Sequence, residues 1–310
     1  MAKLQSTEIV GVANRPATIC SNTMCIWFDT TNLKTVISYC GYAVGTWSAG
    51  GALITGRGRL SGAGTQNSGL AMGGSGPLSC TEEYNGTSWS VGGALIIGRD
   101  FLAGAGTQNL GLAAGGFTTV ATSCTEEYNG TSWSVGGALI TARCRLAGAG
   151  TQNEALAVGG YNSGINYTCT EEYNGTSWSA GGALITGRSG LAGAGTQNAG
   201  LVAGGDPSLC TEEYNGTSWS AGGALITARP FLAAAGTQNE GLVTGGGNYP
   251  GSTCTEEYNG ISWLAGGALA TARYGLAGAG TQNAGLVAGG INLTCTEEYN
   301  KALGIVDSIQ

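Results

Sequence analysis

Histidine is absent from this chain of 310 residues, and charged residues make up only 10% of it. Without histidine the chain lacks the commonest general base and the commonest metal ligand, which argues against a catalytic triad or an imidazole metal site. Proline is scarce, at 5 residues, and this excludes collagen in spite of the 59 glycines. Acidic residues outnumber basic ones by 19 to 12, and the net charge of −7 argues against nucleic-acid binding.

Long hydrophobic runs are also missing. No stretch approaches the ~18 apolar residues of a membrane helix, so we expect no membrane insertion. The first ten residues contain one lysine and no apolar core, so we expect no secretory signal. Hydrophobic residues nevertheless reach 42%, which is too many for a disordered linker and predicts a folded chain.

A repeated unit dominates what is present. A tryptophan recurs every 41 to 45 residues, and an arginine follows each tryptophan ten residues later. The tryptophans are Trp47, Trp89, Trp133, Trp178, Trp219 and Trp263, and the arginines are Arg57, Arg99, Arg143, Arg188, Arg229 and Arg273. Between each arginine and the next tryptophan come Thr-Gln-Asn, a Gly-Gly pair and Cys-Thr-Glu-Glu-Tyr-Asn-Gly-Thr-Ser, with small variations.

Each unit predicts four short strands joined by recognisable turns. Thr-Gln-Asn closes the first hairpin, and Asn-Gly, a strong hairpin signal, joins the third and fourth strands. The first strand contains mainly Gly and Ala, so we expect it nearest an axis where the units converge. Four strands in a period of this length predict an all-β β-propeller, in which closing the ring buries both faces of every blade.

The ordered features resemble the kelch family, in which an arginine-led strand precedes a Gly-Gly strand, a tyrosine and a tryptophan. Arg273, Gly289-Gly290 and Tyr299 follow this order, as do five earlier units. Within that family, the sequence of the unit most resembles the kelch-like repeats of tailed-phage structural and tail-fibre proteins. The resemblance covers roughly residues 48–300. It departs from the kelch pattern in the Glu-Glu pair before the tyrosine, where kelch repeats often carry apolar residues.

The number of blades has two interpretations within a single domain spanning residues 1–310. We prefer seven blades because Arg15 precedes Trp47 by the same interval that separates Arg57 from Trp89. Residues 1–14 then form a closing strand, 15–50 a degenerate first blade with strands at 17–20, 24–29, 34–39 and 46–50, 51–300 six repeats, and 301–310 a C-terminal strand or tail. The alternative is six blades, with the strand of Trp47 completing the last unit, which lacks its own tryptophan.

Two repeated residue types invite a chemical interpretation. The six repeated cysteines are expected to be small buried residues, because equivalent positions on neighbouring blades lie too far apart for a disulfide. Adjacent glutamates in a strand point to opposite faces, so a Glu-Glu pair does not form one catalytic site. We expect one glutamate of each pair to bind the repeat arginine and the other to face solvent or a neighbouring blade.

Variation is concentrated in two places. The loops between Gly-Gly and the cysteine differ in length and sequence, and so do the two residues after each arginine. In an up-and-down blade both sets fall on one face of the disc, opposite the Thr-Gln-Asn and Asn-Gly turns. Neutral drift of short loops is the competing explanation. The binding candidates on this face are Arg59, Asp100, Phe117, Arg145, Tyr161, Asn162, Asn166, Tyr167, Asp206, Asn248, Tyr249 and Tyr274.

The resemblance implies a phage virion protein, serving as a tail-fibre, receptor-binding or surface-decorating propeller. Its partners would be other virion proteins, further copies of itself, and a host-surface glycan or protein bound by the variable face. The alternative is a self-assembling unit of a fibre or shell without receptor binding. No nucleophile is paired with a base, so we expect no enzymatic activity, and we expect no cofactor and no bound metal.

Overall fold

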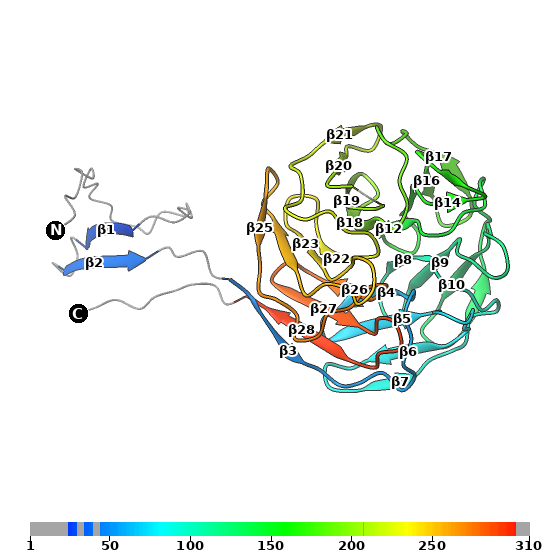
Figure 1. Ribbon diagram of the computed structural model, residues 1–310, viewed down its shortest axis with the longest axis horizontal. Coiled ribbons are helices and arrows are strands. Elements are labelled where there is room, and N and C mark those ends of the chain that lie inside the picture. Colours follow the sequence, from blue (N-terminus) through cyan, green and yellow to red (C-terminus); the bar gives the residue numbers. More distant parts are fainter. Residues whose placement is uncertain (1–23, 30–33, 40–43, 207, 302–310) are drawn as a thin grey trace. The chain divides into compact units, whose positions relative to one another are not determined.

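The computed structural model describes residues 24–29, 34–39, 44–206 and 208–301. The chain divides into two compact units, one of Met1–Val44 with Lys301–Gln310 and the other of Gly45–Asn300. In the described part of the first unit, β1 (Met24–Asp29) pairs antiparallel with β2 (Lys34–Tyr39). In the second unit, six four-stranded antiparallel sheets surround a central axis as blades (Figure 1).

The first blade contains β4 (Ser61–Thr65), β5 (Ser68–Met72), β6 (Thr81–Tyr84) and β7 (Trp89–Val91). The second contains β8 (Ala103–Gly106), β9 (Gly111–Ala114), β10 (Thr125–Tyr128) and β11 (Trp133–Val135). The third contains β12 (Ala147–Gly150), β13 (Ala155–Val158), β16 (Thr170–Tyr173) and β17 (Trp178–Ala180), and its long loop adds the small hairpin β14 (Tyr161–Asn162) and β15 (Ile165–Asn166).

The fourth blade contains β18 (Ala192–Thr196), β19 (Ala199–Ala203), β20 (Thr211–Tyr214) and β21 (Trp219–Ala221). The fifth contains β22 (Ala233–Gly236), β23 (Gly241–Thr244), β24 (Thr255–Tyr258) and β25 (Trp263–Ala265). The sixth contains β26 (Ala277–Gly280), β27 (Ala284–Ala288), β28 (Thr296–Asn300) and β3 (Thr46–Ala49). Across all these described residues, no helix is long and apolar enough to span a membrane.

The ring therefore has six blades in the described chain, and the preferred prediction of seven is wrong. The strand β3 pairs with β28, with Trp47 opposite Tyr299, and it supplies the tryptophan that the last repeat lacks. The segments 24–29 and 34–39 are strands, as predicted, but they pair with each other instead of forming a blade. Residues 15–45 contain neither a Gly-Ala strand nor a Gly-Gly pair, so they lack the small strand that an axial position requires. The expected closing strand within 1–14, the strand at 17–20 and residues 302–310 of the expected C-terminal strand or tail lie outside the described residues.

The first strand of each blade lies nearest the axis, as its small residues predict. These strands, β4, β8, β12, β18, β22 and β26, contact one another in turn around the ring (Figure 1). A Cβ added to Gly148 would lie 2.4 Å from the carbonyl oxygen of Gly104 on the neighbouring strand. Larger side chains would force these strands apart, so Gly and Ala at the centre are a condition for closing the ring.

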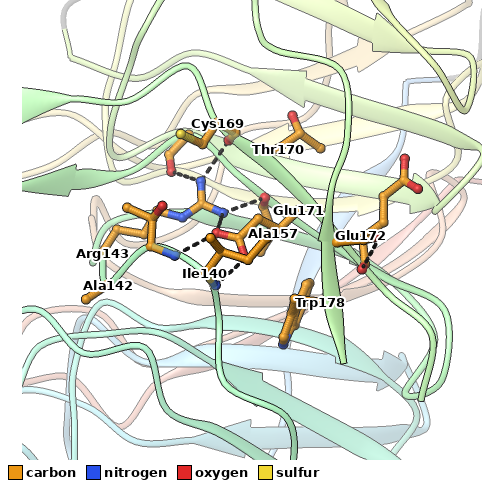
Figure 2. A network of polar contacts seen from close by, with 12 residues as sticks. Ile140, Ala142, Arg143, Ala157, Cys169, Thr170, Glu171, Glu172 and Trp178 are labelled. Atoms are coloured by element: carbon orange, nitrogen blue, oxygen red, sulfur yellow. Dashed lines mark hydrogen bonds and ion pairs between the residues drawn. The ribbon is translucent and has the colours of Figure 1, made fainter. Parts of the chain in front are cut away.

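Each repeat arginine is buried and holds its own blade together, as Arg143 illustrates. Figure 2 shows its guanidinium between the Cys169 carbonyl and the Glu171 carboxylate, at 2.7 Å and 3.0 Å respectively. The other oxygen of Glu171 accepts a 2.7 Å hydrogen bond from the backbone of Ile140. The predicted pairing of the arginine with one glutamate is confirmed in all six blades, as Arg57–Glu82, Arg99–Glu126, Arg143–Glu171, Arg188–Glu212, Arg229–Glu256 and Arg273–Glu297.

The second glutamate of each pair joins neighbouring blades. Oε1 of Glu83 accepts a 2.6 Å hydrogen bond from the hydroxyl of Tyr128 in the next blade, and the same contact recurs around the ring. The tryptophan of the outer strand adds a second link, since Nε1 of Trp133 donates to Oγ1 of Thr81 at 3.1 Å. Tyr128 and Trp133 also pack with ring centroids 4.9 Å apart. These links replace the large hydrophobic contacts that the Gly-rich inner strands cannot make.

The Asn-Gly turns join the third and fourth strands of the blades, as predicted. Only the glycine has a positive φ, as Gly86 does at 91°. The side chain of Asn85 instead accepts hydrogen bonds from the backbone of Thr87 and Ser88, at 3.0 and 2.9 Å. The asparagine is therefore selected as an Asx-turn acceptor.

Candidate functional site

The two sets of variable residues lie side by side on one face, as predicted. Asp100 follows a repeat arginine and exchanges two backbone hydrogen bonds, of 3.0 and 2.7 Å, with Phe117 in the long loop of the same blade. Cys144 and Tyr161 form the same pair of bonds in the third blade. We call this surface the variable face.

The opposite face is held constant by packing. The glutamine of each Thr-Gln-Asn turn reaches into the preceding blade, where Nε2 of Gln108 donates to the carbonyls of Gly69 and Tyr84 at 3.1 and 2.7 Å. The threonine and asparagine of each turn are exposed, but the glutamine is buried or half-buried. Because the glutamine has a structural role, the constancy of these turns is no evidence against drift of the loops. Only features of the variable face itself can therefore distinguish recognition from drift.

The centre of the variable face is closed by a ring of backbone hydrogen bonds. The second residue after each repeat arginine donates its N–H to the carbonyl of the equivalent residue in the preceding blade, at 2.6 to 2.9 Å. Six such bonds close the circle. The ring residues are Arg59, Phe101, Arg145, Gly190, Phe231 and Gly275.

All six ring residues have positive φ, between 52° and 66°. Glycine adopts this conformation without strain, and Gly190 and Gly275 do so in the fourth and sixth blades. Arginine or phenylalanine there costs about 1 kcal/mol or more per residue. Four blades thus carry a strained side chain where glycine would serve the fold, and such strain is a recognised mark of functional positions.

The four side chains gather over the axis. The guanidiniums of Arg59 and Arg145, from the first and third blades, lie 4.9 and 5.0 Å from the ring centroid of Phe101 in the second. The ring of Phe231, from the fifth blade, lies 5.5 Å from that of Phe101. Arg145 also lies 5.2 Å from the ring of Tyr161. We call these five residues the axial mouth.

A cavity of about 110 Å³ lies at the axial mouth. The ring residues line it together with the small residues of the first strands, such as Gly104 and Ala147. A leucine from each blade, such as Leu146, also lines it, and the charged and aromatic side chains of the lining are confined to the ring. A ligand at this position would therefore be recognised by the side chains of the ring residues.

Charge at the mouth differs from that of the chain as a whole. The six repeat arginines are paired with buried glutamates, but Arg59 and Arg145 are not part of that set. Arg59 lies 3.5 Å from the carboxylate of Asp100, and its side chain is 43% exposed. Burial raises the pKa of Asp100, while Arg59 acts in the opposite direction. Two guanidiniums facing one carboxylate leave the mouth positive within a chain of net charge −7.

Two polar atoms of this cluster are buried without a hydrogen-bond partner. They are Oδ1 of Asp100 and Nε of Arg145. Within the part of the chain that the structure describes, Arg145 makes cation–π contacts and no ion pair. Its charge is therefore not neutralised in the way that the repeat arginines are.

The twelve predicted binding residues fall into two groups. The structure brings Arg59, Asp100, Arg145 and Tyr161 together at or beside the axial mouth. The others are placed in the surrounding loops or beside the ring, as Phe117, Asn162, Asn166, Tyr167, Asp206, Asn248, Tyr249 and Tyr274.

The loop residues differ widely in what they can offer a ligand. Tyr249 is 85% exposed. Asn162 is half-buried, and its side-chain amide donates to the carbonyl of Ala142 at 3.0 Å, so it has a structural role. Phe101 and Phe231 were missing from the candidates, although they occupy the same repeat position as Arg59 and Arg145. That shared position is the signal that could have identified them.

The repeated cysteines are not the buried residues that we predicted. Cys210 and Cys254 are exposed, and Cys80, Cys124, Cys169 and Cys295 are half-buried, all as free thiols. In the third blade it is the carbonyl of Cys169, and not its thiol, that binds Arg143. Among the described residues, no group of three or more Cys, Asp or Glu side chains gathers as a metal site.

A scan against protein-family models and a search of curated proteins found no match to this chain.

Proposed function

We propose that this chain is a non-catalytic recognition propeller that binds a host-surface glycan or protein through its variable face. The observation that carries this proposal is the strained axial mouth. Four non-glycine side chains are held at positive φ at a position where two blades use glycine. A position that serves only the fold would favour glycine in every blade, so the strain indicates selection for the side chains themselves.

The rest of the fold supports binding without catalysis. Both members of every Glu-Glu pair are engaged in contacts that hold blades together, so the most numerous carboxylates are committed to structure. A rigid scaffold that presents loops of different length on one face is a common arrangement for recognition. Tyr249 and Tyr161 offer rigid amphipathic surfaces suited to a glycan or a protein.

The second part of the proposal concerns where the propeller acts. The repeat sequence resembles the kelch-like repeats of tailed-phage structural proteins. We therefore propose that the chain is a virion component, serving as a tail-fibre or surface-decorating module. Several copies on one particle would multiply a weak affinity for the host surface. Other virion proteins would then hold the propeller in place.

Immunogold electron microscopy tests the location. Virus particles are concentrated from cultures that produce this chain, and antibody raised against the purified chain is applied to them. Label at tail tips agrees with receptor binding, and label over capsids agrees with surface decoration. The absence of label from every virus-like particle contradicts the virion assignment.

A second candidate function, self-assembly into a fibre or shell, is favoured by one observation. An isoleucine in the segment that enters each of the first five blades is 54 to 63% exposed, and the residues are Ile54, Ile96, Ile140, Ile185 and Ile226. The preceding leucine bonds to the variable loop, as Leu139 does to Ser123, so the isoleucines belong to the variable face. Sedimentation of the chain with and without Ile140→Ser and Ile185→Ser tests this. Large assemblies that the substitutions dissolve would support self-assembly, and a monomer in both cases would exclude it.

A further inference from the structure

The six blades share nearly identical strands and turns, and they differ in their variable loops and at the axial mouth. There the ring positions read Arg, Phe, Arg, Gly, Phe and Gly in chain order. Phe101 and Phe231 come from blades on opposite sides of the ring, and their rings meet across the axis. The two arginines flank Phe101 from either side. The glycines of the fourth and sixth blades add no side chain, so the cluster is built unsymmetrically on a symmetric frame.

The chemistry of this cluster is specific. A cation–π contact uses no acceptor, so the N–H donors of Arg145 are not matched to any oxygen of the described protein. Its Nε is buried without a partner, as is the Nε of every repeat arginine, so the feature that sets Arg145 apart among the described residues is the lack of a paired carboxylate. Arginine presents planar paired donors that fit a carboxylate. Aromatic faces beside those donors provide an apolar surface for the carbon skeleton that carries the acid.

Resting on the proposed recognition function, we propose that the axial mouth binds the carboxylate of an acidic sugar in the host-surface ligand. Arg145 is the carboxylate-binding residue. Arg59, held by Asp100, adds the second positive charge, and Phe101 and Tyr161 contact the apolar face of the sugar ring. Asp100 is a positioning residue, because its carboxylate is buried and faces Arg59.

A saccharide fits better than an acidic peptide for reasons of size and surface. The cluster offers two guanidiniums around one aromatic ring, which suits a single carboxylate on a compact ring. An acidic segment of protein would favour a row of cations along its path. In the propeller, however, the remaining arginines are buried in ion pairs with glutamates.

The test measures binding of the full chain by calorimetry to two matched probes. One is an oligosaccharide ending in glucuronic acid, and the other is the same oligosaccharide ending in glucose, which lacks the carboxylate. We expect the acidic probe to bind about tenfold more tightly at low salt, with an advantage that shrinks as salt rises. The variant Arg145→Gly should lose that advantage and leave binding of the neutral probe unchanged.

Glycine is a suitable replacement because the molecule already uses it at this position. Gly190 and Gly275 hold the same backbone conformation, so Arg145→Gly should keep the melting temperature. If that variant fails to fold, Arg59→Gly provides the same test at the first blade. Glu154→Gln, at an exposed turn on the opposite face, is the control and should retain the preference for the acidic probe.

Three outcomes overturn the inference. They are equal affinity for the two probes, an unchanged acidic preference in a folded Arg145→Gly variant, and tighter binding of a glutamate-rich peptide than of the acidic sugar. The proposed function is judged separately on immobilised bacterial envelope polysaccharides. Envelope binding that needs the loops but not Arg145 would leave recognition standing without the acidic-sugar site, and no binding in either assay would contradict both.

Discussion

The hydroxyl of Tyr128 donates a 2.6 Å hydrogen bond to Oε1 of Glu83 in the preceding blade. Its oxygen in turn accepts a hydrogen bond from the backbone of Gly93 at 3.0 Å. The neighbouring residue, Glu82, instead pairs with Arg57 within its own blade. Two adjacent glutamates on one strand therefore point to opposite faces, one stabilising the blade and the other joining it to the next.

Breaking the buried ion pair of a single blade should destabilise the whole ring. Arg143→Met leaves the Glu171 carboxylate buried without its cation, and we expect a loss of about 3–5 kcal/mol in the free energy of unfolding. Denaturant unfolding followed by circular dichroism measures it. Glu154→Gln, at an exposed turn, is the matched control and should change little. Equal stability of the two variants would show that the arginine has no structural role.

High pH should unfold the propeller as its buried tyrosines ionise. Burial and a hydrogen bond to glutamate raise the pKa of Tyr173 and of Tyr258 to about 12. The unfolded value is about 10, so their contribution to stability is fully present below pH ~10 and is lost as pH rises toward 12. Absorbance of phenolate at 295 nm and circular dichroism should therefore change together over this interval. Ionisation of all tyrosines near pH 10 in a folded protein would contradict the prediction.

Closure of the ring depends on β3. Trp47 packs on Tyr299, with ring centroids 4.9 Å apart, and its Nε1 donates to Oγ1 of Thr255 at 2.9 Å. Trp47→Ala should reduce stability by about 3 kcal/mol, because a large half-buried side chain is removed. Hydrogen exchange should then accelerate first in β28 and later in β20. Ser48→Ala, on the same strand and exposed, should leave exchange unchanged, and identical behaviour of both variants would argue against this closure.

Thiol reactivity should follow exposure and not the repeat. Cys210 and Cys254 are exposed, whereas Cys144 is buried, and burial raises the pKa of its thiol. Because the thiolate is the reactive form, iodoacetamide should label Cys210 and Cys254 much faster than Cys144. Peptide mass spectrometry of a labelling time course gives the individual rates. Labelling of Cys144 as fast as the exposed thiols would show that the third blade opens readily in solution.

Much of the fold could be predicted because the local sequence features of every repeat are consistent with the propeller fold. The Gly-Ala strands, the Gly-Gly pairs and the turn residues recur in register, and adjacent glutamates must point to opposite faces. The number of blades was harder to predict because Arg15 lies at the right distance from Trp47. The residues that follow Arg15 have this spacing but lack the small first strand that the axis requires, and β3 instead pairs with β28 to complete the sixth blade.

The site was only partly predictable. Because successive loops of an up-and-down blade lie on alternate faces of the disc, the sequence predicts the variable face. Its variable positions include Arg59, Arg145 and Tyr161. The contact of Phe101 with Phe231 joins residues 130 positions apart and depends on a positive φ that neither residue normally adopts. No local pattern reveals a backbone conformation forced by six-fold closure. The structural role of Gln108 was hidden for the same reason, since its partners lie in the preceding blade.

The most direct test of the account compares two altered chains on immobilised bacterial envelope polysaccharides by biolayer interferometry. In one, the variable loops of the first five blades are replaced by Ile-Asn-Leu-Thr, the loop of the sixth blade, between unchanged Gly-Gly and cysteine flanks, and the ring residues Arg59, Phe101, Arg145 and Phe231 are replaced by glycine. In the other, Glu154→Gln and Glu240→Gln alter the opposite face. With both chains folded by circular dichroism, the account predicts that the first loses binding and the second retains it. Full binding by the uniform-loop chain, or loss of binding by the second chain, would contradict recognition by the variable face.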